Sequence, residues 1–448
     1  MKKKFIAILF LTVGALTYLI LSYYPRLTIV TGFSAKSVAS GIFFANRSQA
    51  SIEEGDNDFS LLPMAENEVD FEERTVRSSI INFKNRKAVY RDGLGATLLP
   101  ENPSGSGNML RPNRKRSKVN LPYPYGDLPQ KDTVFGEIDQ EKLVSAINNA
   151  FDQVEKREKG TRSVLVVYKD QIIGEKYAEG FDESTPILGW SMTKSITATI
   201  YGILQKKGRI NIYEKTGVAE WQNDARAQIT FDNLLQMNSG LEWNEDYADI
   251  SDVTSMLYEA EEMGKVQLEK PQTGKAGESW NYSSGTSNLL AGYLLRNILQ
   301  DHQTYLDFWY AELLDRIGMH SALIETDFHG NFVGSSYAWA TTRDWAKFGL
   351  LYLHQGNWNW EQIFDPEWAD YVSTPTNGSN GRYGGHFWLN AGGHFPDVPR
   401  DMYSANGFQG QTVAIIPSKD LVIVRMGLVE DPDFDFNHFL SEVINSIK

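Results

Sequence analysis

Residues 191–207 read SMTKSITATIYGILQKK. Ser191 and Lys194 stand three positions apart, so on a helix the hydroxyl and the amine lie one turn apart on the same face. Apolar residues recur at helical spacing after Lys194 and Gly208 ends the run, which predicts a helix over this stretch. A serine hydroxyl is a weak nucleophile at neutral pH, and a desolvated lysine beside it can take its proton. The two residues are therefore a candidate nucleophile and base.

Patterns on both sides of this helix predict an α/β (α+β) domain over residues 136–448. The predicted strands pair as two hairpins, 163–168 with 171–178 and 412–416 with 421–424. A helix at each end of the domain covers this antiparallel sheet, with apolar positions repeating over 143–154 and 436–447. Residues 190–370 are mostly helical in pattern and form a subdomain beside the sheet.

The amino-acid composition argues against several classes of function. The chain of 448 residues has no cysteine, which excludes disulfides, iron–sulfur clusters, cysteine zinc sites and a thiol nucleophile. A net charge of −14 argues against a nucleic-acid partner. The seven histidines include no His-Glu-x-x-His, so no metal and no cofactor are expected.

The N-terminus predicts a membrane anchor in residues 1–24. Three lysines precede Phe5 to Tyr24, an uncharged and mostly apolar run of 20 residues that can cross a bilayer. No small-residue cleavage site follows. We expect a single-pass protein of the bacterial inner membrane whose catalytic domain lies in the periplasm. Secretion after signal cleavage is the alternative.

Residues 25–135 predict an irregular N-terminal extension. The stretch from Leu99 to Asp132 is rich in Pro, Gly and Asn. The one basic cluster, residues 111–118, is interpreted as a solvated loop.

Two further polar motifs can take part in catalysis if the fold brings them close to Ser191. In the first, residues 281–285 (NYSSG), Tyr282 can relay a proton and Ser284 can hydrogen-bond Lys194. The second, residues 406–411 (NGFQGQ), leads into a strand, so that the backbone N–H groups of Ser191 and Gln411 can form an oxyanion hole.

The combination Ser191-x-x-Lys194, Tyr282-x-Ser284 and residues 407–411 (GFQGQ) resembles the serine hydrolases of the class C β-lactamase and penicillin-binding protein family. Residues 229–241 and 340–352 look like the same family. The resemblance covers residues 136–448. It implies a beta-lactamase/transpeptidase-like fold with the serine between the sheet and the helical part. It also implies an acyl-enzyme on Ser191 that water releases.

The chain departs from the lactamase pattern at two positions. Phe408 stands about where a Lys-Thr-Gly motif would have its lysine, so no cation would meet a substrate carboxylate. Ser284 replaces an asparagine. The pattern is closer to the esterase and 6-aminohexanoate-dimer hydrolase branch, which implies small-molecule ester or amide substrates. Ser284, Phe408 and Gly410 are then the predicted substrate-binding residues.

Two alternatives remain open. One is a penicillin-binding DD-peptidase or β-lactamase. The other is a catalytically silent, membrane-anchored binding protein, against which the complete set of Ser191, Lys194 and Tyr282 counts.

Overall fold

The computed structural model describes residues 2–81, 83–105, 107, 109–131, 133–152 and 158–448, without the side chains of 2–13, 15–23 and 83. The chain forms two compact units. The first unit comprises Met1–Arg91, Ala96–Gly107 and Asn244–Glu261, and the second comprises Asp92–Gly95, Asn108–Trp243 and Glu262–Lys448.

The first unit contains a helix packed on a four-stranded antiparallel sheet. Its elements are α1 (Lys2–Phe43), α2 (Gln49–Ser51), η1 (Ile52–Asp56), η2 (Leu62–Met64), β1 (Glu66–Asp70), β2 (Thr75–Ile80), β3 (Phe83–Arg91), β4 (Gly95–Leu98) and α6 (Asp252–Tyr258). The buried face of α1 includes Val30, Phe33 and Val38. Lys36 is also buried, and its amine donates to the carbonyl of Ala96 at 2.7 Å.

These strands contradict part of the prediction for residues 25–135. Residues 66–98 form a sheet instead of an irregular extension. The sequence does not predict these strands, because β1 (ENEVD) and β2 (TVRSSI) are polar and have too few apolar positions to show a clear period of two. Among the described residues between β4 and α3, no helix or strand element occurs, so the prediction of irregular structure holds for this part.

The predicted membrane anchor receives no support from the structure. Where side chains are described, no helix is both long and apolar enough to cross a membrane. Apart from Gly14 and Tyr24, the side chains of residues 5–24 lie outside the described residues. The anchor therefore stays a prediction.

The second unit is built on a six-stranded antiparallel sheet with the order β12-β13-β14-β15-β5-β6. Its strands are β5 (Ser163–Tyr168), β6 (Gln171–Tyr177), β12 (Trp388–Leu389), β13 (Tyr403–Gly407), β14 (Gln411–Ile416) and β15 (Leu421–Met426). Both predicted hairpins are confirmed, since β5 pairs with β6 and β14 pairs with β15. The first and last parts of the domain meet where β5 pairs with β15.

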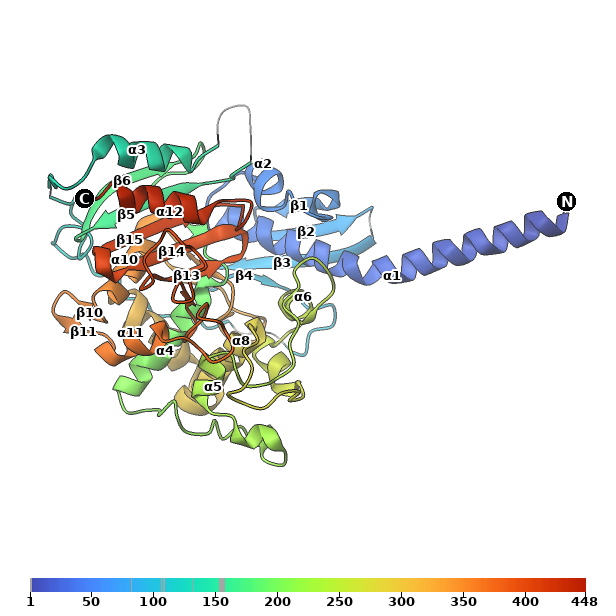
Figure 1. Ribbon diagram of the computed structural model, residues 1–448. Coiled ribbons are helices and arrows are strands. Elements are labelled where there is room, and N and C mark those ends of the chain that lie inside the picture. Colours follow the sequence, from blue (N-terminus) through green and yellow to red (C-terminus); the bar gives the residue numbers. More distant parts are fainter. Residues whose placement is uncertain (1, 82, 106, 108, 132, 153–157) are drawn as a thin grey trace. The chain divides into compact units, whose positions relative to one another are not determined.

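Helices cover both faces of this sheet (Figure 1). The terminal helices α3 (Gln140–Asn149) and α12 (Phe436–Asn445) pack on one face, as predicted. α4 (Met192–Lys206) and α10 (Thr342–Leu353) pack on the other. Successive strand residues alternate between the two cores: Val164 and Val166 belong to the first, Leu165 and Val167 to the second. Burial on both faces explains why these strands read as continuous apolar runs.

The remaining elements form a mostly helical region, in agreement with the prediction for residues 190–370. They are α5 (Phe231–Leu235), α7 (Met263–Val266), α8 (Ser284–Tyr293), α9 (His302–Trp309) and α11 (Pro366–Ser373), with η3 (Ala219–Trp221), η4 (Ala225–Gln228), η5 (Gln267–Glu269), η6 (Leu294–Leu299) and η7 (Tyr310–Leu314). Short strands also occur: β7 (Ile187–Leu188), β8 (Leu323–Ile324) and β9 (Ala338–Ala340) form one sheet, β10 (Asn357–Trp358) and β11 (Glu361–Gln362) another.

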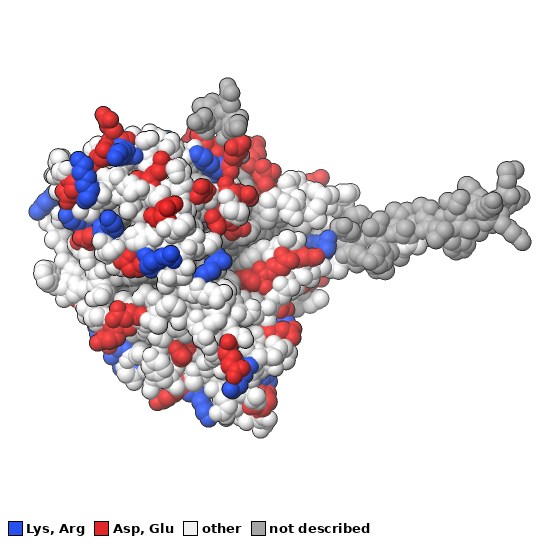
Figure 2. Space-filling model, viewed as in Figure 1, with Lys and Arg blue, Asp and Glu red and all other residues white. Residues whose placement is uncertain are grey.

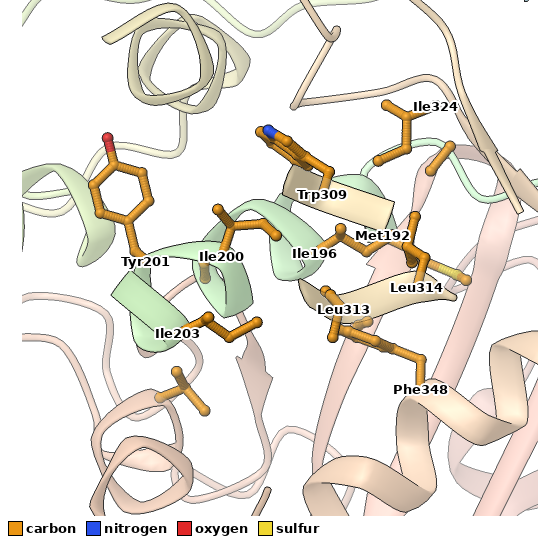
Figure 3. Close-up of a cluster of buried hydrophobic side chains, with 14 of the residues drawn as sticks. Met192, Ile196, Ile200, Tyr201, Ile203, Trp309, Leu313, Leu314, Ile324 and Phe348 are labelled. Carbon is orange, nitrogen blue, oxygen red and sulfur yellow. The ribbon is translucent and has the colours of Figure 1, made fainter. Parts of the chain in front are cut away.

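The predicted helix at residues 191–207 is α4, and it lies in the larger core. Figure 3 shows Met192, Ile196, Ile200 and Ile203 of α4 among Trp309, Leu313, Leu314, Ile324 and Phe348 from other elements. Apolar side chains thus surround α4, so its polar groups need partners within the protein.

Charged side chains of both signs are interspersed on the face shown in Figure 2. Most of the basic cluster 111–118 is exposed and irregular, in agreement with the solvated loop that the sequence predicted. Arg114 is the basic residue that departs from this, because it is half-buried, its side chain pairs with Asp315 and its guanidinium lies 4.2 Å from the ring centre of Tyr310. The pairing holds this irregular segment against η7.

A second polar contact holds the irregular stretch between β4 and α3 to the six-stranded sheet. Tyr125 donates to Asp170 at 2.8 Å, and Asp170 lies 2.6 Å from the Nε2 atom of His354 at the end of α10. The hydrogen bond with Asp170 raises the pKa of His354 above its ordinary value. Burial opposes ionisation of Asp170, but hydrogen bonds from His354 and Tyr125 outweigh it and lower the pKa of that carboxyl.

We expect Asp170→Asn to destabilise the protein more at about pH 6 than at about pH 9. The raised pKa of His354 gives stability that is present below about pH 6.5 and lost as the pH rises through the folded-state pKa. The lowered pKa of Asp170 gives stability that is present above about pH 4 and lost as the pH falls. The loss near pH 6 should be about 1–2 kcal/mol, measured by thermal unfolding at both pH values.

Glu278→Gln is the matched control, because it neutralises a carboxylate in an exposed pair with Lys275. It should change the melting temperature little at either pH. A loss in Asp170→Asn that is equal at both pH values would contradict the ion pair.

Candidate active site

A tight turn presents Ser191 at the start of α4. The N–H of Gly189 donates to the carbonyl of Ala338 at 2.8 Å, which ties the end of β7 to β9. Trp190 follows with φ of 49°, a left-handed conformation that is rare for a large residue. Ser191 occupies the N-cap position, yet its hydroxyl makes no cap hydrogen bond. The Ser191 hydroxyl is thus available for a hydrogen bond with Lys194.

The amine of Lys194 lies at the centre of the site. Its Nζ atom is 2.9 Å from Ser191 Oγ, 2.8 Å from Ser284 Oγ and 3.1 Å from the carbonyl oxygen of Ser335. Only 1% of Lys194 is exposed. Burial disfavours the charged form of a lysine, whereas these oxygen partners give an ammonium three acceptors.

The second predicted motif converges on the same amine. Ser283 caps α8 by accepting from the N–H of Thr286 at 3.0 Å, and Ser284 follows as the first residue of the helix. The ring centre of Tyr282 lies 4.8 Å from Lys194 Nζ. The structure therefore brings Ser191, Lys194, Tyr282 and Ser284 together, as the sequence predicted.

Tyr282 also belongs to a cluster of four aromatic rings with Trp280, Tyr383 and Trp388. Ring centres are 5.7 Å apart between Tyr282 and Tyr383 and 5.4 Å apart between Tyr282 and Trp388. Trp280 contacts both Tyr383 and Trp388. This packing holds the Tyr282 ring beside the amine.

The end of β13 approaches the nucleophile at Gly407. A Cβ atom at this position would lie 2.0 Å from the carbonyl oxygen of Gly189 and 3.1 Å from the Cβ of Trp190, so a side chain has no room there. The ring of Phe408 meets that of Trp190 edge-on, with centres 5.5 Å apart. Phe408 therefore packs against the residue that precedes Ser191 in the chain.

Gln411 pairs with Gly407 across the β13–β14 hairpin, and the predicted oxyanion role of its backbone N–H stays a prediction. The side chain of Gln411 bonds in both directions with the backbone of Gly427. The carbonyl of Gly410 accepts from Arg425 at 2.9 Å. A short 3-10 turn, η8 (Phe408–Gly410), directs both residues toward this part of β15. The backbone of Gly407 approaches Gly189 and Trp190, the two residues before Ser191, and this contact was not predicted because a turn, and not a straight strand, follows Gly407.

Sequence reasoning also missed the polar face of α8. Asn288 donates to the Ser335 hydroxyl at 3.0 Å and accepts from the Ser335 N–H at 3.2 Å. These two bonds orient the Ser335 carbonyl that accepts from Lys194. The signal was present in the sequence, because Ser284, Ser287 and Asn288 share one helix face and all three are buried.

His386 is the other residue that was missed. Only 2% of it is exposed, although it lies in a glycine-rich stretch that resembles a surface loop in sequence. Its ring contacts Ser287 and the carbonyl of Leu235. Burial, together with the nearby charge of Lys194, lowers its pKa to about 3, so the ring is neutral at ordinary pH.

The structure offers no metal centre in the residues it describes, where no group of three or more His, Asp or Glu side chains could hold an ion.

The comparisons with known proteins identify the family of the chain. The family model described as Beta-lactamase matches residues 147–437. A 6-aminohexanoate-dimer hydrolase from Paenarthrobacter ureafaciens is 25% identical over 318 residues, which cover 63% of this chain and 76% of the relative.

Solved structures show the same fold. A Bacillus anthracis protein assigned as a 6-aminohexanoate-dimer hydrolase has a TM-score of 0.56 and 19% identity, covering 69% of this chain and 84% of that one. A class C beta-lactamase mutant has a TM-score of 0.51 and 14% identity, covering 70% of this chain and 99% of the other.

Proposed function

The chain belongs to the beta-lactamase family and is a serine hydrolase, and from this premise we propose that it cleaves carboxylic esters or short amides through an acyl-enzyme on Ser191. The observation that carries the proposal is the distance of 2.9 Å between Lys194 Nζ and Ser191 Oγ in a buried environment. A base at this distance can take the serine proton directly.

The partners of Lys194 support its role as the base. When the amine is neutral, its two protons can go to Ser284 Oγ and to the Ser335 carbonyl. The lone pair then faces the hydroxyl of Ser191. As Ser191 Oγ bonds to the substrate carbonyl carbon, its proton passes to Lys194, and the carbonyl oxygen becomes an oxyanion.

Collapse of this intermediate needs a proton for the leaving group. Tyr282, whose ring lies beside the amine, is proposed to pass the proton from Lys194 to the departing alcohol or amine as the carbon–oxygen or carbon–nitrogen bond breaks. Water then attacks the acyl carbon and passes a proton through Tyr282 to Lys194, and Lys194 returns a proton to Ser191 Oγ as the bond between the acyl carbon and this oxygen breaks. For the oxyanion, we propose the backbone N–H of Ser191 together with the facing ends of β13 and β14, where Gly407 pairs with Gln411.

The surroundings of Ser191 favour uncharged substrates. Trp190 packs against Phe408 on one side and against Tyr337 on the other, with ring centres 5.5 Å and 5.8 Å apart. Apolar rings do not compensate a substrate carboxylate for its lost hydration. The relative from Paenarthrobacter ureafaciens is named for hydrolysis of a 6-aminohexanoate dimer, a short amide with charged ends, and this name supports amide cleavage by this chain without bearing on the preference for uncharged substrates.

We expect Ser191→Ala to abolish hydrolysis of p-nitrophenyl butyrate while the protein stays folded. Lys194→Ala should reduce kcat by a similar factor, about 1,000-fold or more, because nucleophile and base act as one unit. Activity is measured on purified protein, and folding is checked by circular dichroism.

A fluorophosphonate probe separates this proposal from a silent binding protein. The probe should label the parent protein and not Ser191→Ala. Turnover that persists in Ser191→Ala at the parent rate would refute the role of Ser191.

Hydrolysis of a chromogenic cephalosporin should be weak or absent. We propose that the substrate carboxylate would meet the uncharged ring of Phe408, which packs against Trp190, the residue before Ser191. The test compares kcat/KM for the cephalosporin and for p-nitrophenyl butyrate. Efficient cephalosporin turnover would favour the β-lactamase reading.

We also propose that residues 5–24 anchor the protein in the bacterial inner membrane with the hydrolase domain in the periplasm. The support is the uncharged run of 20 residues after three lysines. The full chain should stay with the membrane fraction after extraction with alkaline carbonate, and a chain lacking residues 1–24 should not. Release of an N-terminally shortened protein into the medium would favour the secreted alternative.

A further inference from the structure

His386 makes hydrogen bonds to three separate helices. Its ring Nε2 atom lies 2.9 Å from the hydroxyl of Ser287 on α8. Its Nδ1 atom lies 2.7 Å from the carbonyl of Leu235 at the end of α5. Its backbone carbonyl accepts from the hydroxyl of Ser195 on α4 at 2.8 Å. One buried residue thus connects the helix that carries Lys194 with the helix that carries Ser284.

The chemistry of these partners defines the state of the ring. A carbonyl can only accept, so Nδ1 carries the proton and donates to Leu235. Nε2 then has a lone pair and accepts from the Ser287 hydroxyl. A neutral imidazole satisfies both partners, and no hydrogen-bonding atom of the ring is left over.

The contacts of His386 with Ser195 and Ser287 lie close to the residues of the proposed active site. Ser195 is the residue after Lys194, and Ser287 lies one helical turn after Ser284. The distance from Ser191 to Lys194 is set within α4. The distance from Lys194 to Ser284 instead depends on how α4 and α8 are placed against each other.

We propose that His386 is a positioning residue that sets the distance between Lys194 and Ser284 and so aims the lysine lone pair at Ser191. This inference rests on the proposed function, in which Lys194 is the base. If α8 shifts, the amine loses one of its two remaining acceptors and can turn its lone pair away from the Ser191 hydroxyl. A change of this kind lowers the rate of the chemical steps more than it alters substrate binding.

Another hydrogen bond between the same helices provides a matched control. The hydroxyl of Tyr201 on α4 donates to the carbonyl of Leu290 on α8 at 3.1 Å, and the Tyr201 ring is fully buried. Its position on α4 lies about two turns beyond Lys194. Tyr201→Phe therefore removes a buried contact between α4 and α8 away from the reacting groups.

The test compares steady-state kinetics and melting temperatures of His386→Ala, His386→Asn and Tyr201→Phe with those of the parent. His386→Ala should lower kcat for p-nitrophenyl butyrate by about 10- to 100-fold and leave KM within about threefold. His386→Asn should restore part of kcat, because an amide N–H can donate to Leu235 and asparagine tolerates the φ of 64° at this position. Tyr201→Phe should lower the melting temperature and keep the parent kcat.

Parent and Ser191→Ala are measured in the same series. If the parent turnover is independent of Ser191, the proposed function fails. If the parent depends on Ser191 but His386→Ala keeps the parent kcat, the positioning role alone is refuted. It is also refuted if Tyr201→Phe lowers kcat as much as His386→Ala at an equal loss of melting temperature, because His386 would then act only through stability.

Discussion

Burial of the Lys194 amine is the constraint on which the rest of the site depends. A lysine that is only 1% exposed loses its hydration, and each of its hydrogens then needs an acceptor in the protein. Those acceptors come from the turn before α4, from the start of α8 and from Ser335. The three segments are far apart in the chain, so the second unit must fold as a whole before the amine is satisfied.

The sheet provides the rigidity that this arrangement needs. Its central strands are buried on both faces, and α4 lies on one face within the larger core. Side chains packed at such density cannot shift independently, so polar atoms attached to α4 keep their positions. The same packing encloses the polar face of α8, where Ser284, Ser287 and Asn288 each meet a partner. Apolar packing thus determines where the polar contacts form.

The sequence predicted the features that have local signals. The two hairpins, α4 and the convergence of Ser191, Lys194, Tyr282 and Ser284 follow from periodicity and motif spacing. The four-stranded sheet of the first unit was not predicted, because its first two strands are polar. The orientation of the Gln411 side chain could not be predicted, because it depends on the η8 turn and on Gly427, which lies 16 residues further along the chain. Neither feature has a periodic pattern that a single sequence displays.

His386 shows why a buried polar residue is difficult to recognise from sequence. It stands between two glycines and an aromatic residue, in a composition typical of exposed loops. Its backbone adopts a positive φ, which in most proteins marks a turn. What buries it is the closure of three helices around the site, each of which supplies one hydrogen-bond partner. A neutral imidazole suits this position because one ring can donate to a carbonyl and accept from a hydroxyl at the same time. An ammonium or a carboxylate in its place would lack either the donor or the acceptor, and it would bring a second charge close to Lys194.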